Sequence, residues 1–260
     1  MTGQRSLQHI RAFGLRNYIA KKVFGISPAI YHKVFRPQTC DFIQTAYGVD
    51  LAANWDDGTF QMCVFGQHGR KLADLLASQT APFVFLDIGA NQGLFTLLAT
   101  RNPACVHCIA FEPVTDTFEL LKRNATHSPN ADRITCIQAA VSSEAGTAQI
   151  TINEGHSGSA SLASQKGKSF EIKTVSSTEI EALLPKEANL FVKIDVEGFE
   201  GTVIPEVLKL PSASRISHLF SEIDRRWVDF DTISSALADA GLSKQETENT
   251  QHFDLLAERG

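Results

Sequence analysis

The segment FLDIGANQGLF, residues 85 to 95, restricts the possible folds of this chain more than any other stretch. An apolar strand-like run ends in the acid Asp87, a turn with two glycines follows, and a helix-like run begins at Leu94. The run is apolar at successive positions, as a parallel strand buried on both faces is. In open parallel sheets, ligands bind beyond the carboxyl ends of the strands. The segment therefore predicts a strand, a turn and a helix with a ligand site at the turn.

Strand and helix patterns alternate along the rest of the chain. Further apolar strand-like runs occupy residues 106–113, 133–141, 189–198 and 215–224, with helix patterns between most of them. This order is typical of a doubly wound, Rossmann-like α/β fold with a mostly parallel central sheet. TAQITIN and FEIKTVS read as an antiparallel pair beside it, and HFDLLAER at the C-terminus as an edge strand.

Local signals refine this outline. Residues 41–65 read as short strands broken by turns, with a hairpin at Asp57-Gly58, and RKLADLLASQ reads as a helix. Ser177 or Thr178 is expected to cap a later helix at its N-terminus, and Gly241 to end the last one. We expect three parts: a helical arm over 1–40, strands and a helix over 41–80, and the ligand-binding domain over 81–260.

Charge is distributed unevenly between the arm and the rest of the chain. Residues 1–40 contain seven lysines and arginines and no acid, which gives them a charge of +7. Because the whole chain has a net charge of −5, the remaining residues carry −12. Such an arm suits docking on its own acidic domain, which we expect first, or contact with a phosphorylated substrate or an anionic membrane surface. Five cysteines, no secretory signal and no apolar run of about 18 residues favour a cytoplasmic protein, with peripheral membrane contact as an alternative.

The turn after Asp87 differs from a dinucleotide loop. Its glycines follow the pattern Gly-x-Asn-x-Gly, whereas a pyrophosphate cradle needs Gly-x-Gly-x-x-Gly. Gly89 permits a sharp bend, Asn91 tolerates a left-handed backbone, and Gly93 permits close approach of a ligand. A carboxylate before the turn suits a cofactor with a cationic end, and S-adenosylmethionine has an ammonium and a sulfonium group. The alternatives are another nucleotide loop or a turn without function.

Glu112 strengthens the prediction of a nucleoside cofactor. It ends the second strand, 19 residues after Gly93, where an acid in this fold binds the two ribose hydroxyls. The alternative is an acid that caps the helix after Pro113. After the third strand, the backbone groups of Ala139 and Ala140 are placed to contact an adenine edge.

A second group of charged residues lies in KIDVEGFE, residues 193 to 200. Lys193 and Asp195 share a face of the fourth strand by alternation. This strand is expected beside the first, so Asp195 is predicted to face the reactive end of a cofactor held there, and to orient or deprotonate an attacking hydroxyl. Glu197 and Glu200 start the next helix, where acids also favour the helix dipole.

The motifs DIGANQGLF, FEP, AAVSSEAG, SGSASL and KIDVEGFE, in this order, resemble the FkbM family of S-adenosylmethionine-dependent methyltransferases over roughly residues 60–225. The resemblance implies methylation of oxygen, often on sugars of glycans, lipid-linked saccharides or glycosylated natural products. It also implies two groups of site residues. Those expected around the cofactor are Asp87, Gly89, Ala90, Asn91, Gly93, Glu112 and Pro113. Those expected beside the transferred methyl group are Asp195 and Glu197.

Further candidates for the base are Glu222, at the end of the fifth strand, and His156, in the small polar loop EGHSGSAS. Glu222 can instead pair with Arg225 or Arg226. For His156 we expect a solvated loop residue first and a base second. Asp195, Glu197 and Glu222 together can hold Mg²⁺, but their spacing does not require it and we predict no metal.

We expect the acceptor to be a sugar hydroxyl. A polyketide-like or other small molecule is the first alternative, and a noncatalytic binding module is the second. An acidic domain argues against nucleic acid as a partner, and the oligomeric state has no signal in the sequence.

Overall fold

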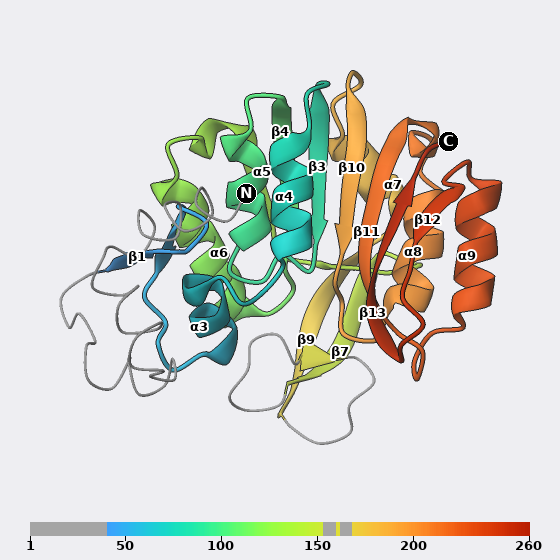
Figure 1. The fold of residues 1–260 in the computed structure, drawn as a ribbon. Helices are drawn as coiled ribbons and strands as arrows, with labels where there is room; N and C mark the ends of the chain where they lie inside the picture. Colours follow the sequence, from blue (N-terminus) through green and yellow to red (C-terminus); the bar gives the residue numbers. More distant parts are fainter. Residues whose placement is uncertain (1–40, 153–159, 162–167) are drawn as a thin grey trace.

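A computed structural model gives the fold and describes residues 41–152, 160–161 and 168–260. The basic arm and His156 lie outside the described residues. The centre is a seven-stranded sheet in the order β12-β13-β11-β10-β3-β4-β5, shown in Figure 1. Its strands are β3 (Phe83–Ile88), β4 (Cys105–Phe111), β5 (Ile134–Ile137), β10 (Asn189–Ile194), β11 (Ile216–Asp224), β12 (Lys244–Glu246) and β13 (His252–Glu258). The five strands from β11 to β5 are parallel, which confirms the predicted fold class.

Helices cover both faces of this sheet. One face carries α4 (Arg70–Ser78), α5 (Leu94–Arg101) and α6 (Thr115–His127), and the other carries α7 (Ser177–Leu183), α8 (Glu200–Leu208) and α9 (Phe230–Asp239). None of the helices in the described part of the chain has the length and apolar character that crossing a membrane requires.

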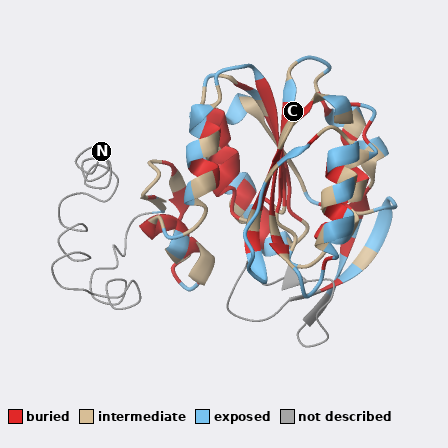
Figure 2. Ribbon diagram, turned by 45° about the vertical axis from the view of Figure 1, so that its right-hand side comes forward, coloured by how far each residue is buried: buried red, intermediate tan, exposed pale blue. Residues whose placement is uncertain are grey.

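Strand β3 shows why its sequence is apolar at successive positions. Val84, Leu86 and Ile88 belong to the core cluster on the side of α7, α8 and α9, whereas Phe83 and Phe85 belong to the cluster on the side of α4 and α5. All six residues are buried, as a parallel strand between two helical layers requires. Burial in Figure 2 is accordingly concentrated in the sheet and on the inner sides of the helices.

A smaller sheet extends from the end of the central one. It contains β6 (Ala140–Val141), β7 (Gly146–Ile152), β8 (Ala160–Ser161) and β9 (Lys168–Val175) in the order β6-β9-β7-β8. Strands β7 and β9 are antiparallel, as their sequences predicted.

Before β3, the chain forms β1 (Phe42–Gln44), β2 (Asp50–Ala52) and α3 (Gly58–Phe65). The predicted hairpin at Asp57-Gly58 is wrong. The Asp57 carboxylate instead accepts a hydrogen bond from the Phe60 N–H, at 2.7 Å, and caps α3. An aspartate before a glycine favours both structures, and here the cap stabilises the helix.

Two details in the C-terminal half also differ from expectation. Ser176, not Ser177 or Thr178, caps α7 in a capping box with Glu179. Strand β13 is not an edge strand, because the three-residue β12, which the sequence did not reveal, pairs with its outer side. Gly241 takes the left-handed conformation after α9, at φ 86°, as its position predicted.

Candidate active site

A cavity of about 420 Å³ lies at the carboxyl ends of β3, β4, β10 and β11. This volume falls within the range of roughly 300–1,000 Å³ that is usual for small-molecule sites. The structure brings ten of the thirteen predicted site residues into its lining. They are Gly89, Ala90, Asn91, Glu112, Pro113, Ala139, Ala140, Asp195, Glu197 and Glu222. The other three are Asp87, Gly93 and His156, of which His156 is not described.

The turn after β3 brings the backbone to the cavity wall. Gly89 has a φ of 75°, and a Cβ atom there would lie 1.9 Å from the carbonyl oxygen of Asp195. Only glycine therefore lets the ends of β3 and β10 approach this closely. Asn91 has a φ of 50°, the left-handed conformation that the sequence predicted.

Gly93 has a different role from the predicted close approach to a ligand. It does not line the cavity, and a Cβ atom there would lie 2.6 Å from the Leu121 side chain of α6. Its φ of 88° starts α5 and lets that helix pack against α6.

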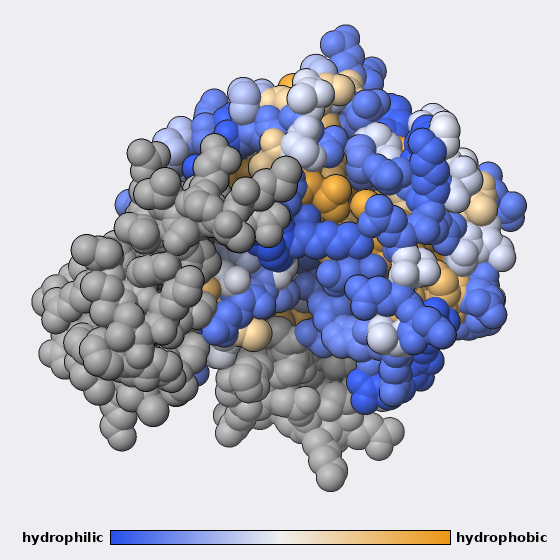
Figure 3. All heavy atoms as spheres, viewed as in Figure 1, coloured by the Kyte–Doolittle hydropathy of each residue, from blue (hydrophilic) through white to orange (hydrophobic). Residues whose placement is uncertain are grey.

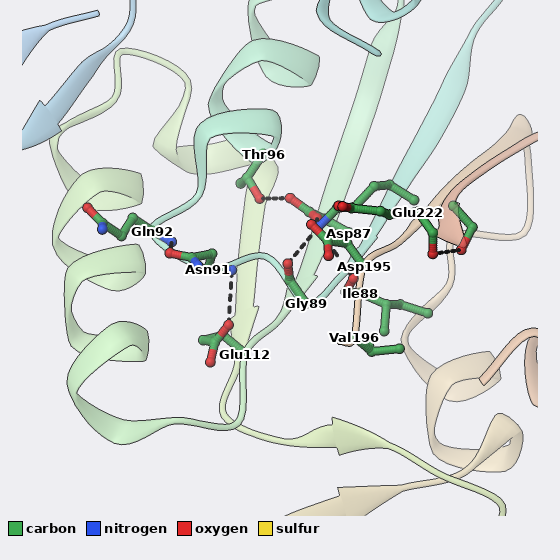
Figure 4. Close-up of polar contacts among 12 residues, drawn as sticks. Asp87, Ile88, Gly89, Asn91, Gln92, Thr96, Glu112, Asp195, Val196 and Glu222 are labelled. Atoms are coloured by element: carbon green, nitrogen blue, oxygen red, sulfur yellow. Dashed lines mark hydrogen bonds and ion pairs between the residues drawn. The ribbon is translucent and has the colours of Figure 1, made fainter. Parts of the chain in front are cut away.

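Asp87 lies beneath the cavity rather than in its wall, with no exposed surface. One carboxylate oxygen accepts a hydrogen bond from the Thr96 hydroxyl at 2.7 Å, and the other lies 3.3 Å from the ammonium of Lys193. Lys193 donates to the carbonyl oxygen of Gly89 at 2.5 Å and lies 3.5 Å from the Asp195 carboxylate (Figure 4). The predicted shared face of Lys193 and Asp195 is confirmed, and Lys193 joins the two strand ends.

Glu112 lies at the opposite end of the turn. Its two carboxylate oxygens accept hydrogen bonds from the N–H groups of Asn91 and Val114, each at 3.0 Å. A carboxylate accepts about four hydrogen bonds, so both oxygens keep capacity for hydroxyl groups of a ligand. Burial raises the pKa of Glu112 to about 7. The bond to Val114 joins Glu112 to the residue before α6 and not to an N–H group of the helix itself.

Asp195, Glu197 and Glu222 line the cavity together with Lys193 and form an acidic wall. Asp195 and Glu222 are labelled in Figure 4. Burial, and then the charges of Asp195 and Glu222, raise the pKa of Glu197 to about 8. Burial and the charge of Asp195 raise the pKa of Glu222 to about 7, although Glu222 is paired with His252. The positive charges of Lys193 and His252 offset these two shifts only in part. Among the residues the structure describes, no group of three or more His, Cys, Asp or Glu side chains is arranged to hold a metal ion.

Sequence reasoning missed the cavity residues that α3 and the loop after it supply. They are Thr59, Met62, Cys63 and His68. None lies in a motif, because their position depends on how the N-terminal part of the chain packs over the turn.

The family model of the methyltransferase FkbM domain matches residues 87–259, or 173 of the 260 residues. The chain belongs to the FkbM family of methyltransferases. This confirms the resemblance that its motifs carry, and the match extends past residue 225, where those motifs end.

Individual proteins similar to this chain share low sequence identity with it. The FkbM chain is 31% identical over 109 residues to the methyltransferase sdnD of Sordaria araneosa, and the aligned part spans 42% of this chain and 40% of that relative. It is similar in structure to the complex of aTrm5 with tRNALeu, with a TM-score of 0.50, 12% identity, and coverage of 86% of this chain and 54% of that one. It also resembles TrmK of M. capricolum bound to S-adenosyl-homocysteine, with a TM-score of 0.45, 12% identity and coverage of 74% and 69%. At 12% identity, the similarity to the aTrm5 structure bears on the fold alone.

The cofactor of this family is S-adenosylmethionine, as the turn predicted. The cavity fits it in two respects. The acidic wall, with its raised carboxylate pKa values, suits a sulfonium and an ammonium group. Glu112 and the backbone at Ala139 and Ala140 offer hydrogen-bonding groups at the other end, where a nucleoside fits.

Proposed function

We propose that this protein transfers the methyl group of S-adenosylmethionine to a hydroxyl group of a sugar-containing acceptor. The observation that carries the proposal is the acidic wall. Asp195, Glu197 and Glu222 all line the cavity, as does the turn after β3 to which we assign the cofactor. Carboxylates accept hydrogen bonds from hydroxyl groups, and a sugar presents several at once.

The cofactor supplies an activated methyl group on a sulfonium, so the protein's contribution is orientation and proton removal. Holding the acceptor oxygen in line with the methyl group can supply several kcal/mol. In our proposal Asp195 orients the hydroxyl, because the ammonium of Lys193, 3.5 Å away, and the strand end keep its carboxylate in place. Glu197 and Glu222 accept hydrogen bonds from neighbouring hydroxyl groups.

The remaining predicted residues are assigned to the cofactor. Glu112 binds the ribose hydroxyls, the backbone of Gly89, Ala90 and Asn91 faces the methionine part, and Pro113, Ala139 and Ala140 border the adenine. Asp87 acts indirectly, because its only described polar partners are Thr96 and Lys193.

An exposed tryptophan supports a sugar as the acceptor. The face in Figure 3 is mostly hydrophilic, and the exposed large hydrophobic residues of the described chain belong to separate elements. Trp227 is the most exposed of them, at 57%, whereas Trp55 is buried in the core. The Trp227 indole packs against Gly198, next to Glu197, where a Cβ atom would lie 3.3 Å from it. It thus offers an exposed apolar ring surface beside Gly198, the neighbour of the cavity residue Glu197, on which a sugar face can stack.

The charge distribution supports a small or glycan acceptor rather than nucleic acid. The −12 carried by residues 41–260 and the acidic wall would repel a phosphate backbone. The basic arm is proposed to dock on this acidic domain, or to attract an anionic carrier or membrane surface. Deleting residues 1–37 tests the role of the arm. Activity on a free sugar should persist in the shortened protein. A loss of activity confined to a lipid-linked sugar would support binding of the carrier by the arm.

The direct test is to incubate the protein with cofactor labelled on its methyl group and with extracted glycans, glycolipids and small metabolites. We expect the label on a sugar hydroxyl. Asp195→Asn is expected to lower turnover by a larger factor than it lowers cofactor affinity. Label found only on a nonsugar molecule, or on nucleic acid, would contradict the proposed acceptor class.

A further inference from the structure

His68 lies in the cavity wall, and the described part of the chain offers its ring no hydrogen-bonding partner. It belongs to the loop between α3 and α4 and lines the cavity together with Asp195 and Glu222. Its backbone carbonyl accepts a hydrogen bond from the Tyr47 hydroxyl. No described residue forms a hydrogen bond with either ring nitrogen, so both are available to a ligand in the cavity.

The loop that carries His68 is fixed on both sides. Gly66 ends α3 and Gly69 precedes α4, and both have a left-handed backbone, at φ 63° and 67°. A Cβ atom at Gly69 would lie 2.1 Å from the ring of Phe95, so the loop rests directly on α5. The Tyr47 hydroxyl anchors the loop between these two glycines. The imidazole is therefore held in place by its backbone rather than by its own hydrogen bonds.

Phe95 places His68 on the reactive side of the site. The two ring centroids are 5.7 Å apart, and the ammonium of Lys193 lies 5.8 Å from the same Phe95 ring. Lys193 in turn lies 3.5 Å from the carboxylate of Asp195. His68 therefore lies in the same cavity as Lys193 and Asp195, close enough for their charges to act on its ring.

We propose that His68 is the base that removes the proton from the acceptor hydroxyl. This inference rests on the proposed function and assigns a residue for its proton transfer. The acceptor oxygen forms a bond to the methyl carbon with a lone pair, and the electrons of the breaking carbon–sulfur bond stay on sulfur. The hydroxyl proton passes to a ring nitrogen of His68 and later to water.

The charges around His68 suit this role better than those around the carboxylates. Burial and the nearby ammonium of Lys193 lower the pKa of His68, while Asp195 and Asp254 of β13 oppose that shift. The net lowering leaves the imidazole neutral at pH 7, ready to accept a proton. Glu197, with its pKa raised to about 8, is largely protonated at that pH. Asp195 is paired with Lys193 and suits orientation of the hydroxyl rather than removal of its proton.

Replacement by glutamine tests the proposal while keeping a polar side chain in the loop. His68→Gln should lower kcat by roughly 10²–10⁴-fold, the usual contribution of general base catalysis. Affinity for S-adenosyl-homocysteine, measured by calorimetry, should stay within about twofold. The matched control is His127→Gln, because His127 lies on α6, away from the cavity, and forms an ion pair with Asp50. It should retain full activity.

Two measurements separate a base from a structural residue. In His68→Gly, added imidazole should restore turnover in proportion to its unprotonated fraction. In the wild-type protein bound to S-adenosyl-homocysteine, the carbon resonances of the His68 ring should titrate below pH 6.5. Turnover of His68→Gln within threefold of wild type on any hydroxyl acceptor, or a ring still protonated at pH 8, would refute the role. Failure of the proposed function is distinct, since the wild-type protein would then methylate no sugar.

Discussion

Lys193→Met removes the cation that connects Asp87, Gly89 and Asp195. Lys193 is 3% exposed and Asp87 is fully buried, so water cannot replace the lost charge. The ammonium lies 3.3 Å from the Asp87 carboxylate. At that separation, with an effective dielectric constant of about 20, the attraction is about 5 kcal/mol.

Part of this attraction offsets the cost of burying both charges, and the Thr96 hydroxyl still stabilises Asp87 in the variant. Removing one partner of a buried pair usually costs about 3–5 kcal/mol, because the other charge remains buried. We expect Lys193→Met to lower the free energy of unfolding by an amount in that range. Asp87→Asn in the same chain should restore part of the loss, since an amide carries no charge.

Urea unfolding, followed by circular dichroism at pH 7, measures the wild-type protein, both single variants and the double variant. We expect a coupling energy of about 1–3 kcal/mol, as residues in one ion-pair network show. The control is Lys209→Met, whose ammonium pairs with Glu206 at 2.8 Å but is 62% exposed, so its loss should cost about 1 kcal/mol or less. Additive effects of the two substitutions, or a cost of Lys193→Met no larger than that of the control, would refute the reasoning.

Three further predictions concern the cavity. Gly89→Ala should reduce cofactor affinity more than tenfold in calorimetry, because the added Cβ atom would overlap the Asp195 carbonyl. The control is Gly201→Ala, which should have no effect because a Cβ atom there would have no neighbouring atom within 4 Å. Affinity for S-adenosylmethionine relative to S-adenosyl-homocysteine should rise between pH 6 and 9, because Glu222 and Glu197, with pKa values of about 7 and 8, ionise in this range. A constant ratio of the two affinities would contradict an acidic wall that binds the sulfonium. Trp227→Ala should raise the KM for the sugar acceptor roughly three- to tenfold, and Trp227→Phe much less; equal KM values for both variants and wild type would exclude stacking.

The same raised pKa values predict how the stability of the unliganded protein depends on pH. Glu112, Glu197 and Glu222 bind protons more tightly in the folded protein than in the unfolded chain. Their protonation therefore favours folding below about pH 4.5, and this contribution is lost as the pH rises through about 7 to 8. A Tm that increases steadily from pH 5 to pH 8 would show that these three side chains do not dominate the pH dependence of stability.

The sequence alone determined the central sheet and the position of the site. Apolar runs buried on both faces predict parallel strands, and the parallel strands place Asp87, Glu112 and Asp195 at one edge of the sheet. Strand ends are local features, so residues next to them can be read from the chain. At Asp57-Gly58 the sequence is compatible with both a hairpin turn and a helix cap, and it favoured the hairpin, which is wrong. Which of the two forms depends on the packing of α3.

Only the tertiary structure decided which site residues reach the cavity and which support it. Asp87 and Gly93 belong to the motif but lie behind the wall, because Lys193 covers the first and Leu121 packs against the second. His68 belongs to no motif, yet the packing of its loop on Phe95 brings it into the cavity. The motif identifies the residues that form the turn. The side chains that face the ligand depend on contacts between segments far apart in the chain, and a single sequence does not specify those contacts locally.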